Sequence, residues 1–370
     1  MPEDDGRFGR RTADTQPTVG RRAFLAAGGA GGLGALAGCF GVLETEPASR
    51  EPPLPENRPD EAYVPSHVEG MQMVGMQTQG RYACALSYTW PHRFWLVRGS
   101  DTDQVDVRGA DDVHMMAAVW DTETGVVLPG ASPSIEYTGP EDESESFSPW
   151  QMLSQRMGVH FGDNVTLGPE GVYSVSVQVA PPSTRRTATE SVPTDPLTFD
   201  FELTFERDGM ESLSYEDIPA DREGTPGAVD PMDMHGVSQS RAPPADDLPG
   251  TVRGPEPTGG AELAVSTLDE RGRLATGDDE RYLVASLRTP HNRYVLPAAS
   301  VSATAEAGGE SVFDDDLRPT LDAALGYHYG AVVPTGKSLD EVTVRVDTPP
   351  QVSRHEGYET AFFDFDAVTF

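Results

Sequence analysis

The side chains best suited to metal binding, histidine and methionine, gather in three stretches of the first half of the chain. These stretches are HVEGMQMVGMQ from His67, DDVHMMAAVWD from Asp111 and RMGVHFGDNV from Arg156. From Gly260 to the C-terminus the chain keeps three histidines but has no methionine. Thioether sulfur selects Cu(I), imidazole suits copper, zinc and iron, and carboxylates favour harder ions. A metal site is therefore expected in the first half.

Spacing within these stretches indicates which side chains meet. Residues two apart in a strand project to the same face, which places Met116 beside His114. The same spacing relates Met71 and Met73. His160 lies between two glycines, where the backbone can turn sharply and present the imidazole. The candidate ligands of a copper, iron or zinc ion are His114, His160, Met71, Met73, Glu69 and Met116.

The residues alone leave a second interpretation open. Methionines commonly fill cores, and a histidine in a strand is commonly satisfied by a hydrogen bond. A further group of the same residue types, Met232, Met234 and His235, lies in a low-order stretch and is a candidate mobile relay for the ion.

A pentad of Gly, apolar or aromatic, His, aromatic, Gly occurs twice, around His160 and around His328. The same offset of 168 positions relates VVLPGASPSIEYTGPEDE from Val126 to YVLPAASVSATAEAGGE from Tyr294. Motifs that keep one offset indicate an internal duplication. At the position that matches His114 the second copy has Tyr282, so the second copy is expected to lack the metal site.

Alternation of apolar and polar residues predicts strands in both copies, as in VYSVSVQVA, FDFELTF and EVTVRVD. Short strands separated by Pro, Gly and Asp predict an all-β fold of two β-sandwich domains in tandem, the second diverged. The predicted boundaries are 65–207 for the metal-binding sandwich, 208–259 for a linker and 260–370 for the degenerate repeat.

The N-terminal segment has the features of an export signal. Arg21 and Arg22 precede a run of small apolar residues that ends in LAGC at Cys39. This pattern resembles a twin-arginine signal with a lipoprotein box over residues 1–39. The run is shorter than the roughly 20 apolar residues of a membrane span, which makes a transmembrane anchor the weaker alternative. We expect a lipid at Cys39, an extracellular location on the membrane, and a disordered Pro/Glu-rich stalk over 40–64.

The charge balance is strongly acidic. The chain has 60 Asp and Glu against 27 Lys and Arg, a net charge of −33. These acids are spread along the whole length, a pattern typical of an extreme halophile, because molar salt shortens the Debye length to about 3 Å and screens their repulsion. Nucleic-acid binding is not expected, because no basic patch is present to neutralise phosphates.

The first sandwich resembles the periplasmic ferrous-iron transport protein family over about Pro65 to Arg207. The family's Asp, aliphatic, His, apolar strand is matched by DVHM from Asp112, and its His, aromatic, Gly, any, Asn loop by HFGDN from His160. The family's methionine-bearing first segment looks like GMQM after Glu69, with glutamines where the family has a carboxylate. The resemblance implies an immunoglobulin-like sandwich that binds copper or another divalent ion through His, Met and carboxylate.

The resemblance also implies iron uptake beside a membrane permease, by proteins that pair as homodimers. We therefore expect a lipid-anchored extracellular protein that captures iron or copper and passes it to a permease, with its two domains forming an intramolecular pseudo-dimer. A structural or adhesion sandwich without a metal site is the alternative. Catalysis is not expected, because the sequence lacks G-x-S-x-G, H-E-x-x-H and phosphate-loop motifs.

Overall fold

The computed structural model describes residues 52–181, 184–187, 195–269, 274, 277 and 279–370. These residues belong to one compact unit, which begins at Ser49. The predictions for Arg21, Arg22 and Cys39, and those for residues 40–51 of the predicted stalk, lie outside the described residues. In the described part of the chain, no helix has the length and apolarity required to cross a membrane.

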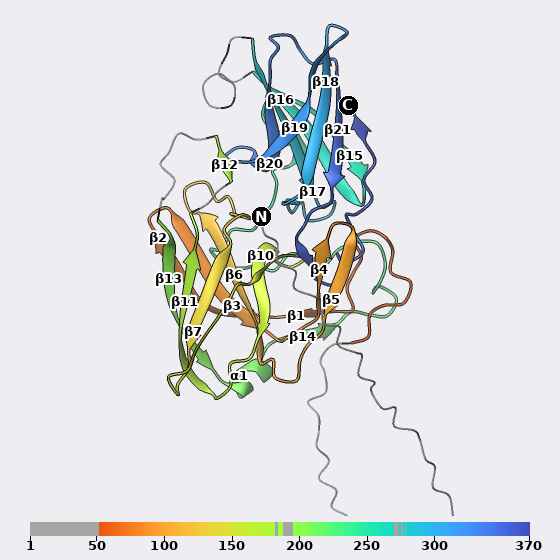
Figure 1. Ribbon diagram of the computed structural model, residues 1–370. Coiled ribbons are helices and arrows are strands. Elements are labelled where there is room, and N and C mark those ends of the chain that lie inside the picture. The colour runs from red at the N-terminus through yellow and green to blue at the C-terminus, as the bar shows by residue number, and fades with distance from the viewer. Residues whose placement is uncertain (1–51, 182–183, 188–194, 270–273, 275–276, 278) are drawn as a thin grey trace, which may run out of the picture. The chain divides into compact units, whose positions relative to one another are not determined.

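The first copy is a sandwich of two sheets (Figure 1). The larger sheet has the order β2-β3-β6-β10-β9-β22-β4-β5, and the smaller has the order β13-β11-β7-β8. The strands of the larger sheet are β2 (Gln72–Gln79), β3 (Tyr82–Thr89), β4 (Phe94–Arg98), β5 (Asp101–Val105), β6 (Val113–Asp121), β9 (Trp150–Ser154), β10 (Gly158–Val165) and β22 (Ser353–Arg354). Those of the smaller sheet are β7 (Pro133–Thr138), β8 (Ser144–Phe147), β11 (Gly171–Val179) and β13 (Leu197–Phe205).

The second copy forms a nine-stranded sheet with the order β15-β16-β17-β20-β19-β18-β21-β23, to which β12 is added beside β19. Its strands are β15 (Thr251–Thr258), β16 (Ala261–Leu268), β17 (Arg281–Arg288), β18 (Ser300–Ala307), β19 (Glu310–Asp322), β20 (Gly326–Val333), β21 (Glu341–Thr348), β23 (Val368–Thr369) and β12 (Arg185–Arg186). The prediction of an all-β fold is confirmed, because α1 (Arg207–Glu211) is the one α-helix among the described residues.

The segment predicted as a linker, 208–259, carries short elements and contributes buried side chains. It contains β14 (Tyr215–Asp217), which pairs with β1 (His67–Glu69), and the 3-10 helix η1 (Ala245–Asp247). Met210, Met234 and Leu248 are buried. This segment covers part of the first sandwich.

Strand β6 is buried along its whole length, so both of its faces are covered. Val113 and Met115 belong to the core between the two sheets, where the alternating apolar side chains of β11 and β13 meet them. His114 and Met116 project to the opposite face. On that face Met116 packs against Met234 of the covering segment. The face of β6 that carries His114 and Met116 is therefore enclosed but lies outside the sandwich core.

The two copies share a strand register as well as a sequence offset. Gly162 of β10 pairs with Met116 of β6, and Gly330 of β20 pairs with Val284 of β17. Both members of the second pair lie 168 positions after those of the first. The duplication read from the sequence is thus repeated in the hydrogen bonding of the strands.

Each copy also donates a two-residue strand to the sheet of the other. Strand β22 runs parallel to β9 and antiparallel to β4 of the first copy. Strand β12 of the first copy runs parallel to β19 of the second, again 168 positions before β22. Directly after β22, the amide of His355 donates to the carbonyl of Leu153, with N and O 3.1 Å apart. A residue from the end of the chain is thereby fixed against the first sandwich.

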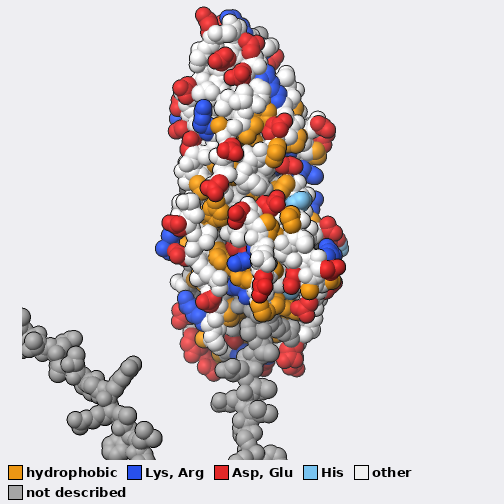
Figure 2. Space-filling model, turned by 90° about the vertical axis from the view of Figure 1, so that its right-hand side faces the viewer, with side chains coloured by type: hydrophobic (Ala, Val, Ile, Leu, Met, Phe, Trp, Pro, Cys, Tyr) orange, Lys and Arg blue, Asp and Glu red, His pale blue; other side chains and the backbone are white. Residues whose placement is uncertain are grey.

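Acidic side chains are spread over the surface. On the face shown in Figure 2, Asp and Glu lie over both halves, and Lys and Arg are scattered among them without forming a patch. This distribution agrees with the net charge of −33.

Candidate metal centre

Four imidazole rings from separate parts of the fold converge at the covered face of β6. His114 comes from β6, His160 from β10, His92 from the loop before β4, and His355 from the residue after β22. Ring centroids of His92 and His114 lie 4.1 Å apart, and those of His92 and His355 lie 4.7 Å apart. The His355 centroid lies 5.6 Å from His114 and 5.1 Å from His160. Ligand atoms of His92, His114 and His355 all fall within 4.8 Å of one another.

The HFGDN segment, expected to be a loop, lies within strand β10 and fixes the tautomer of His114. The amide of Asn164 donates from Nδ2 to the carbonyl oxygen of His92 at 2.9 Å, which orients its Oδ1 as an acceptor. His114 Nδ1 lies 2.8 Å from this Oδ1 and therefore donates to it. Its Nε2 keeps a lone pair, is buried, and has no hydrogen-bond partner among the described residues.

Gly162 leaves room beside that lone pair. A Cβ at this position would lie 2.7 Å from His114 Nε2 and 3.3 Å from the Sδ of Met152. The glycine of the motif therefore keeps open the space in front of both donor atoms.

His160 is held in the same manner by its own backbone. Its Nδ1 lies 3.0 Å from the carbonyl oxygen of Gly158, which can only accept, so Nδ1 carries the proton. Its Nε2 is buried and is also without a partner in the described part of the chain. Metal-binding histidines characteristically donate from one ring nitrogen to a carbonyl or amide oxygen and present the other to the ion.

His92 and His355 complete the cluster and bring in a thioether. His92 Nδ1 lies 3.1 Å from the carbonyl oxygen of Trp90, and its Nε2 lies 3.1 Å from His355 Nδ1. The other nitrogen of His355, Nε2, lies 3.3 Å from the Sδ of Met152. Met152 pairs with His160 across β9 and β10, so its side chain lies on the same side of the sheet.

Burial holds the four imidazoles in the neutral form that binds metals. Loss of solvation lowers the pKa of His92, and it lowers the pKa of His160 to about 4. The pKa values of His114 and His355 fall well below the usual range for the same reason, with a further contribution from neighbouring histidines. At neutral pH each ring therefore keeps one nitrogen lone pair, and the lone pair of His92 Nε2 accepts from His355 Nδ1.

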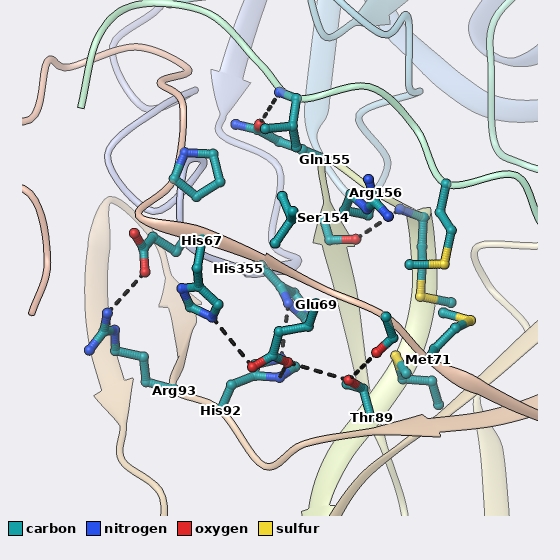
Figure 3. Close-up of a pocket in the computed structure, with 18 residues that line it drawn as sticks. His67, Glu69, Met71, Thr89, His92, Arg93, Ser154, Gln155, Arg156 and His355 are labelled. Carbon is teal, nitrogen blue, oxygen red and sulfur yellow. Dashed lines mark hydrogen bonds and ion pairs between the residues drawn. The ribbon is translucent and has the colours of Figure 1, made fainter. Parts of the chain in front are cut away.

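One carboxylate stands at the edge of the cluster. Glu69 Oε2 lies 3.8 Å from His92 Nδ1, and its Oε1 lies 3.4 Å from His67 Nε2 (Figure 3). The hydroxyl of Thr89 donates to the same carboxylate at 3.3 Å. Glu69 lines a cavity of about 110 Å³ together with His92 and His355.

The structure brings together most of the predicted ligands. His114 and His160 lie in the cluster and Glu69 lies beside it, whereas Met71 and Met116 line the adjoining cavity. Met73 lies apart from the histidine cluster and the cavity. It belongs to β2, which begins at Gln72, and it packs with a cluster that includes Trp120.

Sequence reasoning missed His92, His355 and Met152. The sequence does carry a signal for Met152, because this residue lies in a strand next to the His160 stretch and pairs with His160. His355 had none, because its position depends on a two-residue strand that crosses from the second copy.

In the second copy, protein hydrogen bonds occupy the position equivalent to the histidine cluster. His328 Nδ1 lies 3.1 Å from the carbonyl oxygen of Gly326, as His160 does from Gly158. Its Nε2 is bonded to the hydroxyl of Tyr282 at 3.0 Å. Thr320 pairs with His328 where the first copy has a methionine. The soft donor set is therefore replaced by a hydroxyl network.

Comparisons with known proteins extend over parts of the chain. A family described as a domain of unknown function (DUF7350) matches residues 246–370. No curated protein matches. Among solved structures, a copper-bound variant of FetP from uropathogenic Escherichia coli is 21% identical, with a TM-score of 0.30, and the match covers 36% of this chain and 97% of that one. The same FetP, recombinantly expressed in the periplasm of E. coli and studied as isolated, is 19% identical, with a TM-score of 0.29, and the match covers 38% of this chain and 95% of that one.

Proposed function

We propose that the chain is a metal-binding protein whose cargo is held by His92, His114, His160, His355 and Met152. The observation that carries this proposal is the pair of buried Nε2 atoms of His114 and His160, which have no partner among the described residues. A buried polar atom without a partner costs about 1–3 kcal/mol. Two such atoms in one cluster, each with its tautomer fixed by a bond at Nδ1, are accounted for by an ion that accepts both lone pairs.

The donor set favours copper. Imidazole nitrogens suit copper, zinc and iron, but the thioether of Met152 adds a preference for Cu(I). The carboxylate of Glu69 lies beside the histidine cluster, at the cavity, and would suit a divalent ion that enters from there. Iron remains the second cargo in this proposal, since imidazole and carboxylate together suit Fe(II).

The wider role that we propose is capture and delivery rather than catalysis. A lipid at Cys39 would hold the protein at the outer face of the membrane, where the captured ion passes to a permease. The reciprocal pairing of β12 with β19 and of β22 with β9 supports an intramolecular pseudo-dimer.

Equilibrium dialysis of the mature protein against Cu(I), Cu(II), Zn(II) and Fe(II) tests the proposal. We expect tight binding of one ion at the centre, abolished by His114→Ala and by His160→Ala. The matched control is His328→Ala, which removes the equivalent histidine of the second copy and should leave binding intact. Binding that is unaffected by the first two variants would refute the metal centre and would favour a structural or adhesion role.

A further inference from the structure

Five methionines, which we call the methionine cluster, come together next to the histidines. Three of them are buried and two are half-buried against them. They are Met71, Met116, Met157, Met232 and Met234. They come from four places in the chain: the turn between β1 and β2, strand β6, the turn between β9 and β10, and the segment that covers the sandwich.

Hydrogen bonds made by the backbone atoms of Met232 and Met157 hold the cluster in place. The amide of Met232 donates to the carbonyl oxygen of Arg156 at 2.9 Å, and the carbonyl oxygen of Met232 accepts from Gln239 Nε2 at 2.8 Å. The amide of Met157 donates to the hydroxyl of Ser154 at 3.1 Å. The covering segment is therefore tied to the turn that precedes β10, and its methionines face those of the sandwich.

The cluster opens onto the same cavity as the histidine centre. Four of the five methionines line this cavity, and His92, His355 and Glu69 line it too. Figure 3 shows the sulfur-bearing side chains gathered beside Met71, on the side away from Arg93. Methionines that only filled a core would be enclosed on all sides, whereas four of these border the cavity.

The second copy shows that packing alone does not require methionine here. At the positions 168 residues after Met116 and Met157 stand Val284 and Leu325. Both lie in a closed apolar cluster with Leu248. The same fold positions are thus filled by aliphatic side chains in the copy that lacks the metal donors. In the first copy the sulfur atoms, rather than the apolar volume alone, distinguish the site.

We propose that the methionine cluster is a second metal site, which binds Cu(I) through thioether sulfur. Thioethers are neutral, soft donors that bind Cu(I) and are poor ligands for Fe(II) and Zn(II). The cluster stands at the cavity that leads to the histidines, so an ion selected there lies next to the proposed centre. This proposal deepens the proposed function by naming monovalent copper as the cargo, but the cluster stands on its own residues.

Anaerobic titration of the mature protein with Cu(I) against bicinchoninate tests this site, in chloride-free sodium sulfate because chloride itself binds Cu(I). We expect two bound equivalents for the unaltered protein. The triple variant Met157→Leu, Met232→Leu, Met234→Leu keeps the apolar volume and should lose one equivalent. The matched control is Met210→Leu, a buried methionine of the sandwich core, which should keep both. The single variant Met232→Leu, at a half-buried position, should weaken the same equivalent without unfolding the protein.

This experiment distinguishes the methionine cluster from the histidine centre. The double variant His114→Ala, His160→Ala should lose Zn(II) binding and one Cu(I) while it keeps the sulfur-bound equivalent, which X-ray absorption would show as a shell of sulfur neighbours. Loss of that equivalent only in the methionine variants supports the cluster even where the histidine centre fails. Two equivalents in the triple leucine variant, or a Cu(I) shell without sulfur neighbours in the double histidine variant, would overturn the proposal.

Discussion

The hydroxyl of Tyr282 lies 3.0 Å from His328 Nε2, at the place in the second copy where the first copy has His114 beside His160. The second copy therefore satisfies the Nε2 of its buried imidazole with a protein hydroxyl, whereas the first copy leaves the Nε2 atoms of His114 and His160 without a protein partner among the described residues. This contrast supplies an internal control for every test of the proposed centre.

Gly162→Ala should abolish metal binding. The added Cβ would lie 2.7 Å from His114 Nε2 and would occupy the space in front of the donor atoms. Overpacking of this kind costs about 1–3 kcal/mol of stability. Gly330→Ala crowds Tyr282 at the matching position and should cost a similar amount of stability, but it should leave metal binding unchanged. Urea unfolding and metal titration of both variants check these outcomes, and a Gly162→Ala protein that binds metal normally would contradict the proposed centre.

His355→Ala should remove a ligand that the second copy supplies. We expect the metal affinity to fall and the increase in melting temperature on adding metal to shrink, since a ligand that binds only the folded state stabilises it in proportion to its affinity. Thr187→Ala is the matched control, because Thr187 occupies the equivalent place after β12, where its amide donates to Leu321. Calorimetric melting with and without copper separates the two. An unchanged copper shift in His355→Ala would exclude this residue as a ligand.

Asn164→Leu should weaken metal binding without removing a ligand. Asn164 accepts from His114 Nδ1 and so directs its Nε2 toward the ion. Loss of a group that orients a metal-binding histidine typically costs about 10–100-fold in affinity. Asn164→Asp keeps the acceptor oxygen and should restore most of the affinity. Competition titration measures both variants, and equal affinities for them would argue against this orienting role.

The metal-free protein should lose stability in mild acid. Burial lowers the pKa of His160 to about 4, whereas an unfolded histidine titrates near 6.5. The unfolded state binds more protons between these values, so the free energy of unfolding is fully retained above about pH 6.5 and declines as the pH falls toward 4. At about 1.4 kcal/mol per pH unit, His160 alone accounts for roughly 3 kcal/mol.

Urea unfolding at a series of pH values measures this decline. His160→Gln should flatten it, and His235→Gln, at an exposed position, should not. Equal slopes for the unaltered protein and His160→Gln would show that His160 is not held neutral in the folded state.

Local patterns predicted the strands and part of the site. The alternation of β11 and β13 predicted their buried faces, and the offset between His160 and His328 predicted a duplication that the strand registers repeat. His114 and His160 could be identified because their motifs are contiguous and lie within strands. These features depend on neighbours in the sequence, which is why the sequence reveals them.

The remaining candidate ligands depend on tertiary structure. His355 reaches the first copy through β22, whose pairing partner lies about 200 positions earlier, and no local pattern encodes that contact. Met71 and Met73 were expected on one strand face, but Met71 lies in the turn before β2 and the register of β2 shifts between Met73 and Gly75. Spacing arguments hold only while a strand is continuous.

The crossing of β22 has a consequence for how the proposed centre forms. His355 follows directly after β22, a strand of the second copy that pairs with β9 of the first. In the proposed centre, one of the four imidazoles is therefore in place only when the second copy is docked on the first. Metal uptake would then report that the two copies are joined, since only that arrangement offers the full set of donors.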